Sequence, residues 1–266
     1  SNVLIGKDAG DTLTTGTANV AVGVDALQSE DDHGRNVAIG HSALETLNAG
    51  ADAYNVAVGY TAGVAMTTGV KNTLIGGLAG DALTIGNNNI AIGHKALSTS
   101  VDGDENVAIG YLALEDYEDG DGNGHNTAVG ARSQREATTG EFNTSLGSLS
   151  MGVGVTTGDY NVAIGYNTGL SITTGTDNTI VGGLAGDALT TGERNVAIGR
   201  SAMGSANGSE SRNTAIGWSA LATMDADGAG YNTAVGYNAG AGITTGVQNT
   251  IIGGLAGDAL TEGTAN

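Results

Sequence analysis

A five-residue motif recurs along the whole chain and constrains its fold more than any other feature. It consists of Asn, then Val, Thr or Ile, then a small or aliphatic residue, then Ile, Val or Leu, and finally Gly, as in Asn-Val-Ala-Ile-Gly at 36–40 and 161–165. Successive copies are 17 to 20 residues apart, most often 17. Internal repetition at a short, fixed period is typical of a solenoid, in which each repeat forms one coil. The fifteen asparagines are Asn2, Asn19, Asn36, Asn55, Asn72, Asn89, Asn106, Asn126, Asn143, Asn161, Asn178, Asn195, Asn213, Asn232 and Asn249.

Each coil can be numbered from its Asn as position one. The motif is short, apolar and partly β-branched, so it predicts a strand. Position four is always Ile, Val or Leu, and we expect this column to be buried. The Gly at position five indicates a turn with positive φ or a close approach of two backbones. Ala-Leu pairs such as 26–27 and 43–44 predict a second short strand, and Thr-Thr-Gly, as at 67–69, predicts the turn back.

The sequence therefore predicts an all-β chain: a parallel β-solenoid of fifteen coils of 17–20 residues, forming a single domain over 1–266. Stacked coils would align the asparagines as a scaffold ladder, each amide bonded to the Asn above and below. A longer motif, Gly-Gly-Leu-Ala-Gly-Asp-Ala-Leu-Thr, recurs at 76–84, 182–190 and 253–261, which indicates that blocks of coils were duplicated. We expect the chain to be a segment of a longer fibre.

Composition limits the width of a coil and the class of partner. Gly accounts for 47 residues, and there is one Phe, one Trp and no Pro, so the side chains can fill only a narrow core. The formal net charge of −19 argues against a nucleic-acid partner, because phosphate binding requires positive charge. Much of the negative charge lies in the expected back turns, as at 29–34 and 115–125. No apolar run approaches a membrane span, so we expect no membrane insertion in this segment.

Two columns of aromatic and basic residues are the candidate recognition surface. The first follows the Gly of the motif, at position six, and we call it the position-six column: His41, Tyr60, His94, Tyr111, Tyr166, Arg200, Trp218 and Tyr237. The second, the pre-asparagine column, precedes the motif: Arg35, Tyr54, Lys71, His125, Phe142, Tyr160, Arg194, Arg212 and Tyr231. Rings on a rigid face suit contact with a glycan or receptor. Packing between coils or between chains explains the same columns without any ligand.

The sequence contains no motif typical of catalysis or of cofactor binding. The four histidines lie in different coils without metal-ligand spacing, so we expect no metal, no cofactor and no enzymatic activity. One weak exception is the acidic loop around Asp119, Asp121 and Asn123, whose alternating oxygen donors could hold Ca²⁺. The loop lacks the twelfth-position Glu of an EF-hand, so we favour a solvated charged loop over a calcium site.

The motif resembles the head repeats of YadA-like trimeric autotransporter adhesins and the repeat shafts of phage tail fibres. The resemblance spans essentially all of 2–266 and implies a left-handed β-roll packed as a homotrimer. The coils here are longer than the roughly 14-residue unit typical of those heads. The resemblance implies an extracellular fibre, on a virion or a bacterial surface, that forms or projects a receptor-binding surface.

Two alternative functions remain from the sequence. A monomeric ice-binding solenoid would use a hydroxyl face made by Thr-Thr pairs such as 14–15, 67–68, 173–174 and 244–245, although several coils lack the pair. A polysaccharide-degrading tailspike would need a carboxylate pair on rigid strands, which the sequence does not show.

Overall fold

A computed structural model describes residues 1–118, 124–206 and 208–266. The described chain falls into two compact units, Ser1–Thr139 and Gly140–Asn266. Each unit is a parallel β-solenoid, which confirms the predicted fold class. The expectation of a single domain over 1–266 stays a prediction.

Every coil contributes one three-residue strand, which covers positions two to four of the motif. The strands of the first unit are β1 Val3–Ile5, β2 Val20–Val22, β3 Val37–Ile39, β4 Val56–Val58, β5 Thr73–Ile75, β6 Ile90–Ile92, β7 Val107–Ile109 and β8 Thr127–Val129. Those of the second unit are β9 Thr144–Leu146, β10 Val162–Ile164, β11 Thr179–Val181, β12 Val196–Ile198, β13 Thr214–Ile216, β14 Thr233–Val235 and β15 Thr250–Ile252.

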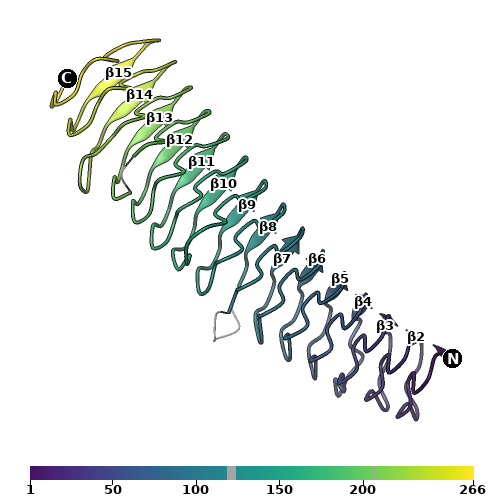
Figure 1. Cartoon of the computed structure of the whole chain (residues 1–266). Coiled ribbons are helices and arrows are strands. Elements are labelled where there is room, and N and C mark those ends of the chain that lie inside the picture. Colours follow the sequence, from purple (N-terminus) through teal and green to yellow (C-terminus); the bar gives the residue numbers. More distant parts are fainter. Residues whose placement is uncertain (119–123, 207) are drawn as a thin grey trace. The chain divides into compact units, whose positions relative to one another are not determined.

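Within each unit, consecutive strands pair in parallel and in register, so each motif position forms a column. Ala38 of β3 pairs with Ala21 of β2 and with Ala57 of β4, for example. The register is kept even across the longest coils, where β7 pairs with β8. Extra residues are therefore absorbed outside the strand, in the back turns, which project on the side away from the arrows (Figure 1).

The column predicted to be buried is not the one that faces the core. Position three is buried in nearly every coil, whereas position four is half-buried or exposed, with Ile39, Ile75 and Ile198 each 37–38% exposed. The reason is the two-residue period of a strand, which places position three on the same side as the buried Asn and position four on the opposite side. The prediction for position four was wrong.

The predicted second strand is also absent from the described residues. The Ala-Leu segments form turns, and positions seven and nine have positive φ, as in Asp25 (57°) and Leu27 (51°). Left-handed residues other than Gly cost about 1–2 kcal/mol each. The positive φ directs their N–H groups to carbonyls of neighbouring coils. Asp25 N donates to Lys7 O at 3.0 Å, and Leu27 N donates to Ala43 O at 2.9 Å. These bonds between coils offset the strain and replace the expected ladder.

Most coils fill their narrow core in one of two ways. Coils with Gly at position nine carry a large apolar residue at position twelve, as in Gly80 with Leu83 and Gly186 with Leu189. Some coils with Leu or Met at position nine carry a small residue at position twelve, as in Met203 with Ala206. A Cβ on Gly186 would come within 3.0 Å of Leu189 Cδ1, so Gly at position nine leaves room for the large side chain at position twelve. Both positions hold a large buried side chain in some longer coils, as with Leu44 and Leu47.

The asparagines join the coils through their side chains. Asn89 N donates to Asn72 Oδ1 at 2.9 Å, and the same bond repeats within each unit, from Asn19 to Asn126 in the first and from Asn161 to Asn266 in the second, with distances of 2.8–3.1 Å. The amide nitrogen crosses its own coil, since Asn72 Nδ2 donates to Gly86 O at 2.8 Å. An Asn that makes both bonds, such as Asn72, ties the start of its strand both to the next coil and to its own back turn.

Replacing a position-five glycine is expected to disrupt coil stacking. In Gly40, φ is 139° and a Cβ would lie 2.1 Å from Gly59 O of the next coil. Gly40→Ala should therefore lower the free energy of unfolding by at least about 3 kcal/mol. Gly50→Ala is the control, because nothing lies within 4 Å of its Cβ and φ is 66°, so we expect a loss of roughly 1 kcal/mol. Chemical denaturation followed by circular dichroism tests this; equal losses in the two variants would contradict it.

Removing an Asn side chain should be costlier where both of its polar atoms are used. Asn72→Ala leaves the Asn89 N–H and the Gly86 carbonyl without buried partners, and we expect a loss of about 2–4 kcal/mol. Asn36 is also fully buried, but its Nδ2 has no partner, so Asn36→Ala should cost about 1 kcal/mol less. The denaturation midpoints of the two variants measure the difference. A larger effect at Asn36 would refute this account of the ladder.

Candidate functional site

The outward side of the strands forms an apolar face between the two aromatic and basic columns. Positions two and four point outward and carry Val, Thr, Ile or Leu in nearly every coil. Several of these side chains are well exposed inside the stack, including Leu146 at 48% and Ile216 at 37%. We call this surface, made of the outward residues at positions two and four, the strand face. Sequence reasoning missed it because it assigned position four to the core.

All eight residues named for the position-six column are exposed. Three neighbouring pairs lie ring against ring: His41 with Tyr60, His94 with Tyr111, and Trp218 with Tyr237, whose centroids are 4.9 Å apart. The rings can meet because residues of one column are one coil apart, and the Trp218–Tyr237 distance is close to the strand spacing of about 4.8 Å. Tyr166 precedes Gly183 in the column and Arg200 follows it, so the row of rings is interrupted there.

The pre-asparagine column forms a second exposed row along the other edge of the strands. Each of its residues has positive φ, for example 57° in Phe142 and 58° in Tyr160. The rings of Phe142 and Tyr160 stack at 5.0 Å with an interplanar angle of 3°. Arg35 lies over the Tyr54 ring at 5.3 Å and donates to its hydroxyl at 3.0 Å. Arg212 lies over the Tyr231 ring in the same way, at 5.7 Å.

These contacts make the columns rigid and leave one side of them in solvent. A ring stacked on its neighbour has lost rotamer freedom before any partner binds, so binding costs little further entropy. The stacked residues of the two columns therefore have a packing role within the chain and remain available to a flat partner. No enclosed pocket is found among the described residues.

The threonine pairs are not a free hydroxyl face. The first hydroxyl of several pairs donates to a backbone carbonyl of the next coil, as from Thr67 to Thr84 O at 3.2 Å and from Thr244 to Thr261 O at 3.3 Å. Thr173 and Thr190 do the same. These hydroxyls are used in stacking coils, which weakens the ice-binding alternative. The alternative itself stays untested.

The remaining site predictions have different outcomes. Asp119, Asp121 and Asn123, the weak calcium candidate, lie outside the described residues. The acidic segment 29–34 was expected in a back turn, and the Glu30 side chain is fully buried there. Its carboxylate lies near Asp31 and His33, a grouping that sequence reasoning missed because these residues read as an ordinary acidic turn.

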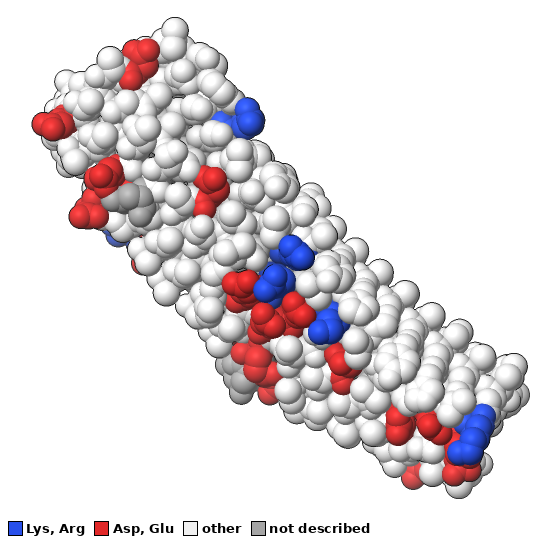
Figure 2. All heavy atoms as spheres, viewed as in Figure 1, with Lys and Arg blue, Asp and Glu red and all other residues white. Residues whose placement is uncertain are grey.

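Charge is gathered in small patches on an otherwise uncharged surface. Figure 2 shows groups of acidic side chains, several with Lys or Arg beside them, separated by wide uncharged areas. Glu115 is an example, since its carboxylate lies 3.7 Å from Lys95 Nζ and 3.6 Å from Arg135 Nε. The more exposed pairs, such as Lys7 with Asp8, contribute little to stability, because solvent screens their charges.

Comparisons of the chain with protein-family models, with curated proteins and with solved structures found no match. Across the ranges that the structure describes, no helix has the length and the apolar composition needed to cross a membrane.

The Trp218–Tyr237 stack provides a spectroscopic test of the column. Trp218 is the one Trp of the chain and is 40% exposed. Tyr237→Ala should expose the ring face of Trp218 that Tyr237 covers, so acrylamide should quench the Trp218 emission more strongly. The change should also lower the free energy of unfolding by about 0.5–1.5 kcal/mol. Tyr60→Ala, in a distant coil, should leave the quenching unchanged. If Tyr237→Ala does not change the quenching, the two rings do not stack in solution.

Proposed function

We propose that this chain is a structural and adhesive segment of an extracellular fibre, either a phage tail-fibre shaft or a bacterial surface adhesin. In this proposal three copies pack side by side as left-handed β-rolls, and the fibre forms or projects a surface that attaches to a host. The proposal assigns the chain no enzymatic activity. Its partners are further copies of itself and a cell-surface glycan or receptor.

The observation that carries the proposal is the strand face. Each coil closes its own narrow core on small residues such as Ala38, yet Ile39 beside it remains 38% exposed. Because the strands are in register, such residues form continuous apolar rows. Contiguous exposed apolar surface on a folded protein usually marks an interface. The three-fold arrangement and the handedness come from the resemblance of the Asn-Val-Ala-Ile-Gly repeats to trimeric adhesin heads and tail-fibre shafts.

The aromatic columns fit both halves of the proposal. Where copies cover the strand face, stacked rings at its edges supply rigid contact area of the kind enriched at interfaces. Where the columns stay uncovered, the same rings suit stacking against the apolar face of a sugar. Tyr60, Tyr166 and Tyr160 are the best exposed candidates for this role.

Light scattering coupled to size-exclusion chromatography tests the assembly. We expect a mass of about three times 26.1 kDa at both low and high salt, because an apolar interface does not depend on charge. The combined variant Ile39→Lys and Ile75→Lys places two charges on the strand face and should give monomers. Both side chains are 38% exposed in a single chain, so the coil itself should keep its fold.

Ile85→Lys is the matched control for this experiment. Ile85 is 51% exposed but lies in a back turn, so its replacement should leave the trimer intact. A monomeric wild-type chain would overturn the assembly. A trimer that survives the strand-face variant and dissociates in Ile85→Lys would show that copies associate through the back turns instead.

A further inference from the structure

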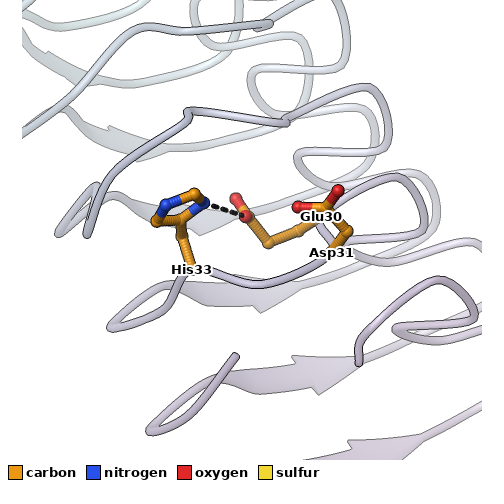
Figure 3. A group of neighbouring side chains, drawn as sticks. All are labelled: Glu30, Asp31 and His33. Carbon is orange, nitrogen blue, oxygen red and sulfur yellow. Dashed lines mark ion pairs between the residues drawn. The ribbon is translucent and has the colours of Figure 1, made fainter. Parts of the chain in front are cut away.

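The residues Glu30, Asp31 and His33 form a cluster in the back turn of the second coil. One carboxylate oxygen of each acid and one ring nitrogen of His33 lie within 4.8 Å of one another. Figure 3 shows the Glu30 side chain reaching towards the His33 ring. His33 Nδ1 is 3.8 Å from Glu30 Oε1 and 2.8 Å from Asp32 Oδ1.

Glu30 is a charged residue at a core position that the other coils fill with uncharged residues. It occupies position twelve, which in the other coils holds apolar, small or hydroxyl-bearing residues such as Leu47, Met66 and Ser100. The Glu30 side chain has no exposed surface, and neither carboxylate oxygen has a hydrogen-bond partner. A buried carboxylate without partners is costly unless a counter-charge reaches it.

The surroundings supply no such counter-charge from a Lys or Arg. Glu30, Asp31 and Asp32 are three consecutive acids, and within the described residues no Lys or Arg forms an ion pair with any of them. Arg35, the nearest cation along the chain, pairs instead with Asp52. Burial raises the pKa of the Glu30 carboxyl, although the backbone amides of Ala49 and His33 lie near enough to oppose this in part.

We propose that Glu30, Asp31 and His33 bind one divalent transition-metal ion of the Zn²⁺ class. Imidazole nitrogen and carboxylate oxygen are ligands that Zn²⁺ accepts, whereas Ca²⁺ and Mg²⁺ favour oxygen alone. Ligand atoms about 2 Å from a tetrahedral ion are about 3.3 Å apart, so the cluster needs only small side-chain rotations to close. Asp31 and His33 are partly exposed, which leaves a path for the ion and room for a water ligand.

The ion would have a structural role. It would neutralise the buried Glu30 carboxylate and fasten the back turn of the second coil, whose backbone already bonds to its neighbours through Thr12 Oγ1, which donates to Glu30 O at 2.8 Å. Binding that occurs only in the folded state stabilises that state. The site is separate from the strand face and does not depend on the proposed assembly.

Titration of tag-free, chelator-treated protein with Zn²⁺ in a calorimeter tests the proposal. We expect saturable binding of one ion per chain and a higher melting temperature in its presence. Glu30→Gln, which keeps the size of the side chain, and His33→Ala should each weaken binding by about tenfold or more. His94→Ala removes an exposed histidine from another coil and should leave the affinity unchanged.

Circular dichroism of each variant checks that the solenoid is intact, and His33 is partly exposed, so its replacement is not expected to disturb the core. No saturable Zn²⁺ binding by the wild-type chain would overturn the proposal. It would also be overturned if Glu30→Gln and His33→Ala bind as tightly as the wild type, or if His94→Ala weakens binding as much as they do.

Discussion

The hydrogen bond from each Asn backbone N–H to the side chain of the preceding Asn is the interaction on which each unit depends. A three-residue strand provides few ladder bonds of its own, so the stack needs further links at the strand ends. The Asn side chain supplies an acceptor to the next coil and, through Nδ2, a donor to its own back turn. One residue type thereby fixes both the spacing of the coils and the width of each coil.

That arrangement forces the rest of the coil into a narrow shape. With Asn facing inward, most coils hold one larger side chain, at position nine or at position twelve, and a longer coil can hold two, as with Leu44 and Leu47. The apolar residues that cannot be accommodated inside remain on the outer side of the strands. The exposed strand face is therefore a consequence of how thin the coil is, and the proposed assembly is a way of covering it.

The repeated backbone also determines which side chains meet. Because columns are spaced by one strand, residues 17 to 19 positions apart become neighbours, and this brings Phe142 against Tyr160 and Trp218 against Tyr237. The same rule places the odd residue Glu30 in a column meant for apolar side chains. Where one coil departs from the common pattern, the departure is a candidate for a specific role.

The sequence by itself determined the solenoid, its period and the Asn and Gly columns. Coils that share one motif adopt the same conformation, so equivalent residues align when the coils stack. It could not determine which side of the strand faces inward: position three and position four are both apolar, and only the burial of Asn sets the phase. Nor could it reveal that Leu27 and its equivalents are left-handed, since that geometry is stabilised by hydrogen bonds to other coils. The tertiary structure alone decided that Glu30 is buried and that the outer rows of Ile and Val stay exposed, because both depend on the stacked coils.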